Sequence, residues 1–376
     1  MDNYCSPNNQ SNSYTCFSNK SLKKIAHAYN DETKNNKIKI PSLEQLSKKK
    51  KRKQLWEDIK KAMIDYTVCK QDHCILNHSY IKSLKKDYLS NDFKPEMPTT
   101  WNDNRYQWLS TIDIMSVMKQ YEDLHTDFLF IGPVPIDFDH ELGFGMCISN
   151  ELCRINLKNL LNKQKKKLGV IFNLDEHYKS GSHWVALFSD FTKGGIYYFD
   201  SYGYPPKKEI KTLMDKIRHQ GNQLLIEHYI DINNLDNEHD NIILIDEFLN
   251  DKTILIKNKQ LINDLSKNDL IFLKKNKKDI LDINNYNIID NIVDNQVTLT
   301  KKITDFDRVY LHDKCYKCFY NQNRFQFKNS ECGVYSMHFI EEFLNGKNFQ
   351  EITNNIFSDE KINKKRQFYY RPSDKS

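Results

Sequence analysis

The alternation of hydrophobic and polar positions predicts a chain of mixed helices and strands. Apolar residues at helical spacing predict helices at 109–121, at 205–221 and from Cys332 onward. Continuous or alternating apolar runs predict strands at 128–131, 170–174 and 222–230, and a hairpin over 183–202. Ser110 is a candidate N-cap, and Gly221 is a candidate helix end. We therefore expect an α+β fold.

Composition divides the chain into regions. Residues 1–40 are rich in Asn, Ser and Lys and hold few large apolar side chains, so a disordered tail is expected there. Apolar residues at roughly helical spacing predict a helical N-terminal extension over 41–97, which ends in a proline-containing linker. A compact domain is expected over 98–376. It is interrupted at about 232–306 by an Asn-, Asp-, Lys- and Ile-rich segment without a clean period, which we interpret as an insertion.

Charge adds one candidate binding surface. The chain of 376 residues has a formal net charge of +6, a mild excess that excludes a dedicated nucleic-acid coat protein. One run is wholly basic, and it consists of Lys48, Lys49, Lys50, Lys51, Arg52 and Lys53. The simpler interpretation is a solvated helix face, and the alternative is a nucleic-acid patch or a nuclear-localisation signal. No apolar run approaches the roughly 18 residues that a membrane span needs, and the N-terminus lacks the pattern of a signal peptide.

The cysteines argue against a disulfide framework, because there are nine of them and they are widely scattered. We therefore expect a reducing location, with Cys147 and Cys153 as plain core thiols. Two groups have spacing that resembles metal ligands, namely Cys315 and Cys318 with His312, and Cys69, His73 and Cys74 with His78. Neither group supplies four ligands at zinc-finger spacing, so no metal and no cofactor are expected.

Four residues form a candidate catalytic set. Cys332 stands before a glycine at a helix start, where the helix dipole and a nearby imidazolium would stabilise a thiolate. His183 begins one strand of the predicted hairpin and Asp200 ends the other, so the carboxylate can orient the imidazole. Gln326 and the Cys332 backbone N–H are candidate oxyanion donors. Each residue alone is more often structural, and it is the four together that favour a catalytic site.

The segments that hold these residues resemble the adenain-like cysteine proteases, which include the SUMO-deconjugating enzymes. "SHW", "YYFDS", "QFKNSECGVY" and "WLSTIDIMSVM" match the family's motifs, and "FIGPVPIDF" is similar to the branch found in large cytoplasmic DNA viruses. The resemblance covers about residues 100–231 and 307–350. It implies a papain-like fold of the adenain type, with a central mixed sheet flanked by helices and the nucleophile at a helix N-terminus.

The same resemblance implies roles for the site residues. Cys332 would be the nucleophile, His183 the general base and acid, Asp200 its orienting partner and Gln326 an oxyanion donor. Trp108 and Trp184 would flank a narrow substrate tunnel. Two indoles leave room for little more than bare backbone, so cleavage after Gly-Gly or Gly-small sites is implied.

Three functions remain open from the sequence. The first is a cysteine endopeptidase that matures viral structural or core polyproteins, located in the virion and the host cytoplasm; nuclear targeting is less favoured. The second is a deconjugase of ubiquitin-like modifiers. The third is an inactive protease-like protein of the virion that binds DNA or a scaffold, with the basic run as its working part. The complete set of His183, Asp200, Gln326 and Cys332 argues against the third.

Overall fold

The computed structural model describes most of the chain. The described residues are 4–9, 14–34, 36–63, 71–81, 89–232, 242–248, 253–256, 270–274, 280–283, 289–293, 296–299 and 316–372. In this part of the chain, no helix is both long enough and apolar enough to cross a membrane.

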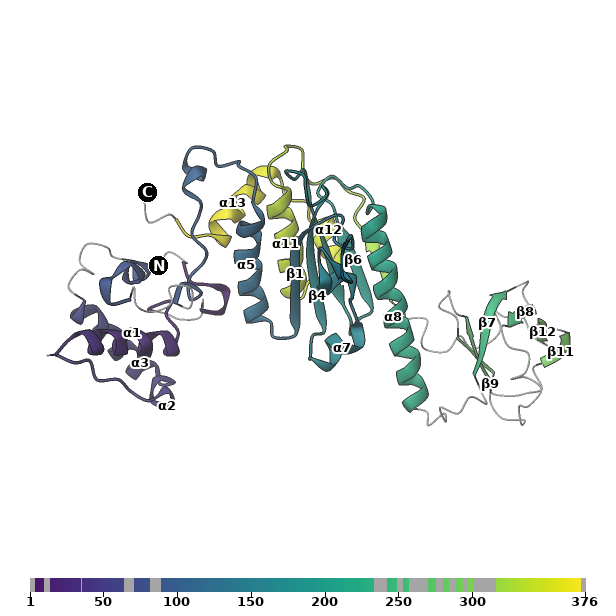
Figure 1. Cartoon of the computed structure of the whole chain (residues 1–376), viewed down its shortest axis with the longest axis horizontal. Coiled ribbons are helices and arrows are strands. Elements are labelled where there is room, and N and C mark those ends of the chain that lie inside the picture. The colour runs from purple at the N-terminus through teal and green to yellow at the C-terminus, as the bar shows by residue number, and fades with distance from the viewer. Residues whose placement is uncertain are drawn as a thin grey trace.

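A five-stranded mixed sheet forms the centre of the molecule (Figure 1). Its strands, in spatial order, are β1 (Phe128–Pro135), β4 (Lys167–Asn173), β5 (Trp184–Asp190), β6 (Gly195–Phe199) and β13 (Lys317–Tyr320). The first and the last pair of neighbours are parallel, and the two central pairs are antiparallel. The predicted α+β class with a mixed sheet is therefore confirmed, and the predicted hairpin is β5–β6.

Helices cover both faces of this sheet. One face packs against α5 (Thr111–Leu124), α11 (Cys332–Leu344), α12 (Phe349–Asn354) and α13 (Asp359–Tyr369). The other face packs against α6 (Asn150–Cys153), α7 (Leu157–Asn162) and α8 (Lys208–Ile232). Strand β5 is buried throughout, with Trp184, Ala186 and Phe188 in the first core and Val185 and Leu187 in the second. This alternation follows from the two-residue period of a strand.

Helix α5 begins as the sequence predicts. The hydroxyl of Ser110 accepts a hydrogen bond from the backbone N–H of Asp113, whose side chain in turn accepts from the Ser110 backbone. This capping box satisfies two N–H groups at the helix start, and it fixes where α5 begins.

Helix α8 corrects two predictions. The sequence predicts a helix end near Gly221 and a strand over 222–230, but the structure has one continuous helix through both. Gly221 serves packing instead, because an added Cβ would lie 2.4 Å from the ring of Tyr316. Leu224, three positions further, still packs against the second core, and short apolar runs do not by themselves separate strand from helix.

A second sheet lies beyond the end of α8 in Figure 1. Its strands are β7 (Ile242–Phe248), β8 (Thr253–Ile256), β9 (Leu270–Lys274), β10 (Ile280–Ile283), β11 (Ile289–Val293) and β12 (Gln296–Leu299), in the order β10-β9-β7-β8-β12-β11. These strands fall within the predicted insertion, and they separate β6 from β13 in the chain without entering the central sheet.

The N-terminal region corrects the expectation of a disordered tail over residues 1–40. Helix α1 (Asn19–Glu32) begins at the N-cap Ser18 and buries Leu22 and Ile25. It packs with α2 (Leu43–Leu46) and α3 (Lys49–Ala62) around Trp56. Although large apolar residues are few, they share one helix face, so they build a small core that composition alone does not reveal.

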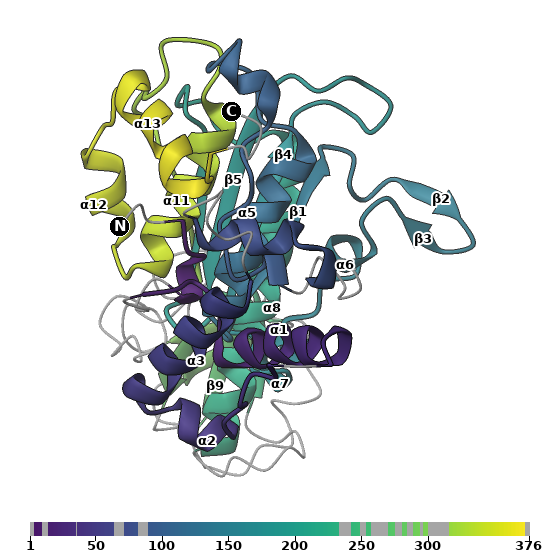
Figure 2. The ribbon, with the colours of Figure 1, turned by 90° about the vertical axis from the view of Figure 1, so that its left-hand side faces the viewer.

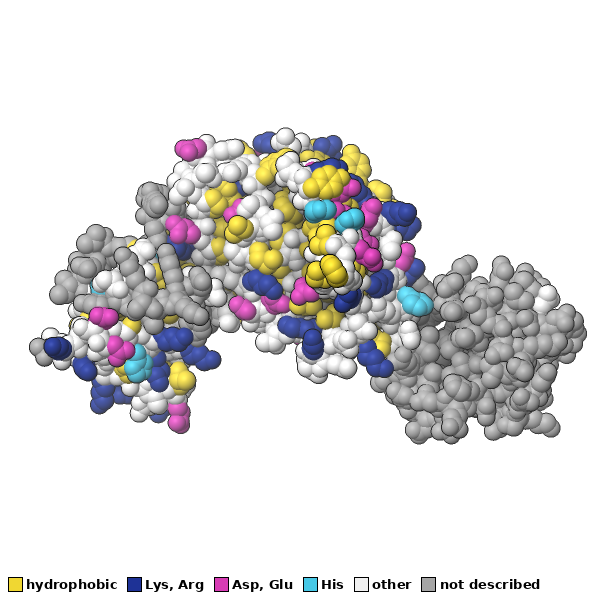
Figure 3. All heavy atoms as spheres, viewed as in Figure 1, with side chains coloured by type: hydrophobic (Ala, Val, Ile, Leu, Met, Phe, Trp, Pro, Cys, Tyr) yellow, Lys and Arg dark blue, Asp and Glu magenta, His cyan; other side chains and the backbone are white. Residues whose placement is uncertain are grey.

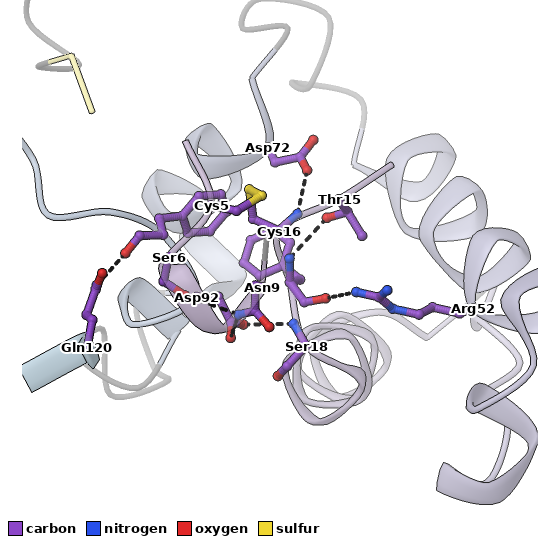
Figure 4. The surroundings of a disulfide bond; sticks show 12 residues. Cys5, Ser6, Asn9, Thr15, Cys16, Ser18, Arg52, Asp72, Asp92 and Gln120 are labelled. Carbon is purple, nitrogen blue, oxygen red and sulfur yellow. Dashed lines mark hydrogen bonds between the residues drawn. A yellow bond between two sulfur atoms is a disulfide. The ribbon is translucent and has the colours of Figure 1, made fainter. Parts of the chain in front are cut away.

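A disulfide between Cys5 and Cys16 closes a loop at the start of this N-terminal unit (Figure 4). Asp92 ties the same loop to the end of the extension, where its carboxylate accepts from the Ser18 backbone N–H and the Asn9 amide. The remaining short helices here are η1 (Pro7–Asn9), η3 (Asp72–Asn77), η4 (Ser79–Ile81) and η5 (Thr99–Asn102).

A second disulfide, between Cys147 and Cys153, corrects the prediction of plain core thiols. It joins the base of the hairpin of β2 (Glu141–Gly143) and β3 (Met146–Cys147) to α6, and Figure 2 shows this hairpin projecting from the body. The turn before α6 brings the two cysteines close because the Cys147 N–H bonds to the side chain of Asn150. Of the cysteines and histidines with metal-like spacing, Cys69, His312 and Cys315 lie outside the described residues.

Candidate active site

The candidate nucleophile lies at the start of a buried helix. Cys332 is the first residue of α11 and is 2% exposed. The next residue must be small, because a Cβ on Gly333 would lie 3.1 Å from Leu109 and 3.2 Å from Trp184. The pair Cys-Gly therefore lets the start of the helix pack closely against Leu109 and Trp184. The first N–H groups of a helix have no partner within it, and Cys332 stands at that end of α11.

His183 and Asp200 meet at the edge of the sheet that faces this helix start. His183 directly precedes β5 and Asp200 directly follows β6, and these strands pair in antiparallel register. The His183 Nε2 lies 2.8 Å from Asp200 Oδ1. The other ring nitrogen is left for the thiol, and the Cys332 side chain is among the groups that raise the pKa of His183. The structure thus brings Cys332, His183 and Asp200 together as the sequence predicts.

Electrostatics favour the charged form of His183. Burial alone would lower the pKa of His183, but hydrogen bonds to Asp200 and to Cys332 outweigh burial and raise this pKa to about 9. The imidazole is therefore protonated at neutral pH, opposite a buried carboxylate that is 1% exposed. An imidazolium beside a thiol at a helix N-terminus is the setting in which a thiolate is stable.

Gln326 lies beside this group but is held by other partners. Its side chain is fully buried, and its Oε1 accepts a hydrogen bond of 2.7 Å from the hydroxyl of Ser201. Its amide nitrogen donates to the carbonyl of Lys328 and, over 3.3 Å, to the hydroxyl of Tyr202. The candidate oxyanion donor is thus held by its own loop and by the two residues that follow Asp200.

Two residues that support His183 and Asp200 are not predicted from the sequence. The Tyr202 ring lies 4.8 Å from the His183 ring, and its backbone N–H donates to Asp200 Oδ1 over 2.8 Å. Asn321 exchanges two hydrogen bonds with the backbone of Asp200, at 2.9 and 2.7 Å. Tyr202 stands in the same motif as Asp200, which is a usable signal, whereas nothing in the sequence around Asn321 marks it.

The two tryptophans have different places. Trp108 is 43% exposed and lines an open cavity of about 820 Å³, together with Tyr202, Phe327 and Lys328. Trp184 is buried, and its indole N–H donates to the carbonyl of Leu109 over 3.0 Å. Among the described residues that line this cavity, only the first of the two tryptophans appears. The substrate tunnel between the two indoles stays a prediction, with Trp108 on the wall of the open cavity and Trp184 buried.

One other cluster of candidate metal ligands lies on α11. His338, Glu341 and Glu342 bring their ligand atoms within 4.8 Å of one another. Glu341 already accepts hydrogen bonds from Lys365 and Tyr369, as well as from His338. Burial would raise the pKa of Glu341, but the hydrogen bond from His338 and the charge of Lys365 lower this pKa to about 2. The cluster is thus a neutralised structural network that needs no ion.

A thiol at a helix start, near a histidine at the edge of a mixed sheet, is the arrangement of cysteine proteases, and the chain is similar to proteins of that class. It is 28% identical over 381 residues to a protein of Acanthamoeba polyphaga mimivirus named "Putative thiol protease", which covers 98% of this chain and 93% of the relative. No family model matches the chain.

A solved structure of a viral protease supports the fold. The crystal structure of the ASFV pS273R protease aligns over 99% of this chain and 97% of its own, at a TM-score of 0.51 and 15% identity. The SUMO protease Ulp1 aligns over 70% of this chain and 75% of its own, at a TM-score of 0.32 and 12% identity. The resemblance to adenain-like cysteine proteases is confirmed.

Proposed function

We propose that this chain is an endopeptidase that matures viral structural or core polyproteins by cleaving after Gly-Gly or Gly-small sites. The observation that carries the proposal is the contact of His183 with Asp200, together with Cys332 at the start of α11, whose side chain is among the groups that raise the pKa of His183. The relative from a mimivirus supports a viral role.

The chemistry follows from these positions. The Cys332 thiolate attacks the scissile carbonyl, and the charge on the carbonyl oxygen is met by N–H groups at the start of α11. His183 then gives its proton to the leaving amine, and it takes a proton from the water that hydrolyses the thioester. Asp200 holds the imidazole in orientation and stabilises its charge throughout.

A preference for glycine is supported by the aromatic side chains around the site. The Tyr202 ring lies against His183, and the exposed indole of Trp108 lines the adjoining cavity. A branched side chain next to the scissile bond would have to displace one of these rings. Glycine has no side chain to clash, and it also adopts backbone conformations that other residues avoid.

The test compares defined substrates with the full-length enzyme. Peptides with Gly-Gly before the scissile bond, and an isopeptide-linked conjugate of a ubiquitin-like modifier, are incubated with the wild type and with Cys332→Ala. We expect the wild type to cut the Gly-Gly peptides and Cys332→Ala to leave them uncut. Cleavage of the conjugate alone would establish the deconjugase instead. Mapping of new protein N-termini in virions made with and without active enzyme then tests the assembly role and the location in virion and host cytoplasm.

We also propose that the N-terminal unit binds nucleic acid. Residues 14–63 hold 14 Lys and Arg against 5 Asp and Glu, so a net charge of +9 gathers there while the whole chain carries +6. Lys48, Lys49, Lys50, Lys51 and Lys53 are exposed around the start of α3, and Figure 3 shows basic side chains on this unit. Arg52 differs, because its guanidinium donates to the Phe17 carbonyl.

The affinity for a short DNA duplex should therefore fall steeply with salt. Replacing the five exposed lysines by glutamine should flatten that dependence, and an unchanged salt slope would exclude this surface.

A further inference from the structure

Helix α13 runs beside α11 in Figures 1 and 2, although it follows α11 in the chain and lies near its end. Three of its residues, Asp359, Asn363 and Arg366, occupy positions i, i+4 and i+7, which share one face of a helix. All three donate to or accept from the segment that runs from Gln326 to Cys332. This face of α13 therefore contacts the segment that leads from Gln326 to the candidate nucleophile.

Asp359 holds the beginning of the segment. Its Oδ2 accepts the backbone N–H groups of Phe327 and Lys328, over 2.9 and 2.8 Å. The carbonyl of Lys328 is in turn the acceptor for the amide of Gln326. A buried carboxylate on α13 thus fixes the peptide that orients the candidate oxyanion donor.

Arg366 and Asn363 hold the end of the segment through Glu331, the residue before the nucleophile. The Arg366 guanidinium makes two hydrogen bonds to the Glu331 carboxylate, at 3.0 and 3.2 Å, and Asn363 adds a third at 2.8 Å. Glu331 is fully buried and Arg366 is 3% exposed. A bidentate pair of this kind fixes the orientation of the Glu331 carboxylate as well as its distance from Arg366. The peptide between Glu331 and Cys332 therefore has little freedom.

The thiol–imidazole pair is held by other elements. His183 and Asp200 lie at the ends of β5 and β6, and α11 packs directly on β5 through Cys332 and the helix behind it. In the described part of the chain, no hydrogen bond joins α13 to His183 or Asp200. The α13 face therefore supports the segment of the oxyanion-binding donors without touching His183 or Asp200.

We propose that the Asp359–Asn363–Arg366 face of α13 is a positioning surface for the oxyanion-binding donors, namely the Cys332 backbone N–H and the Gln326 amide. The inference rests on the proposed endopeptidase function. The three residues do not touch substrate; they act through Lys328 and Glu331. Loss of this face lowers turnover while the thiolate and its imidazolium remain as they are.

The experiment uses the full-length enzyme and two independent substitutions. The double variant Glu331→Gln/Arg366→Met removes the ion pair without leaving a buried charge, a replacement that folds commonly tolerate. Asp359→Ala removes the acceptor at the other end, and Asp359→Asn restores it. Lys364→Met, on the exposed side of the same helix, is the matched control.

Three quantities are measured: kcat and KM on a Gly-Gly peptide, the rate of Cys332 alkylation by iodoacetamide across pH, and the melting temperature. We expect the double variant and Asp359→Ala to lose about 10- to 100-fold in kcat, with KM and the alkylation profile within about 2-fold of wild type. Asp359→Asn should recover most of kcat, and Lys364→Met should match the wild type. Alkylation does not use the oxyanion donors, so a merely structural role would change it together with kcat.

Parallel loss of turnover and alkylation would overturn the inference, as would normal turnover in both variants. If the double variant does not fold, Asp359→Ala and Asp359→Asn test the inference by the same criteria. A wild type that is alkylated at Cys332 but cuts no Gly-Gly peptide overturns the proposed function, and this inference with it. A wild type that cuts the peptide while the variants cut it equally well overturns the inference alone.

Discussion

The side chains of Ser201 and Gln326 share a hydrogen bond of 2.7 Å, although 125 positions separate them in the chain. The hydroxyl donates to the Gln326 oxygen, so the amide N–H groups must point to the other side, toward Lys328 and Tyr202. Ser201 follows Asp200 directly, and its carbonyl also accepts the Gln326 backbone N–H over 2.8 Å. The residue beside the catalytic carboxylate thus sets the direction of the oxyanion donor.

Gln326→Ala should lower kcat by about 10²-fold and leave KM nearly unchanged, because the lost donor acts on the transition state. Ser201→Ala should cost less, about 2- to 10-fold in kcat, since it removes one orienting hydrogen bond and leaves the amide in place. Steady-state kinetics on a Gly-Gly peptide measure both. A rise in KM alone for Gln326→Ala would instead assign this residue to substrate binding.

Cys332→Ala should abolish peptide cleavage and leave the melting temperature within a few degrees of wild type. Among the described residues, Cys332 and Cys318 are the free thiols, and Cys332 is the more buried. Exposure alone would make Cys318 the faster target of iodoacetamide. We expect the reverse, because the imidazolium of His183 favours a thiolate at Cys332 and the thiolate is the reactive form. Peptide mapping by mass spectrometry measures the two rates, and faster labelling of Cys318 would remove the basis for Cys332 as nucleophile.

The raised pKa of His183 predicts the pH dependence. The ordinary pKa is 6.5 and the folded value is about 9, so the proton is held across neutral pH and lost as the pH rises through about 9. Turnover should fall on that alkaline limb, because the leaving amine needs this proton. The same pairing stabilises the fold fully below about pH 6.5, and this contribution disappears as the pH rises through about 9.

Asp200→Asn should move the alkaline limb to lower pH, because the charge that favours the imidazolium is gone. It should also cost less activity than His183→Ala, since the carboxylate orients the proton carrier and does not itself carry the proton. The pH profile of kcat, measured for the wild type and both variants, tests these two expectations. An unmoved limb in Asp200→Asn would mean that Asp200 does not tune His183.

The sequence predicts the parts of this site that lie in short motifs on regular elements. Cys332, His183 and Asp200 each stand at the end of a helix or strand, so a correct hairpin already brings two of them together. Their supports lie elsewhere: Asn321 lies outside the quoted motifs, and Arg366 lies on a helix for which the sequence analysis names no role. Such residues act through tertiary contacts, which periodicity does not report. The predicted helix end at Gly221 was wrong for the same reason, because this glycine is needed where the helix packs against Tyr316.

The different places of the two tryptophans separate specificity from stability. Trp184→Ala should destabilise the fold by about 3–5 kcal/mol, because a buried indole leaves a large cavity. Trp184→Phe keeps most of the apolar volume and should cost less, although the Leu109 carbonyl loses its donor. Trp108→Ala should leave the melting temperature nearly unchanged, since this side chain is 43% exposed.

Wild-type enzyme should cleave after Gly-Gly or Gly-Ala and lose about 5- to 150-fold in kcat/KM when the glycine at P2 becomes leucine. That range corresponds to the roughly 1–3 kcal/mol that forcing a larger side chain into a packed site costs. Trp108→Ala should shrink this ratio, because the indole on the cavity wall is one of the rings that a leucine must displace. A peptide library varied at P1 and P2 and read by mass spectrometry gives the ratio for each enzyme. Equal acceptance of leucine and glycine by the wild type would remove the case for a Gly-Gly protease. An unchanged ratio in Trp108→Ala would move the selectivity to Tyr202, whose ring lies against His183.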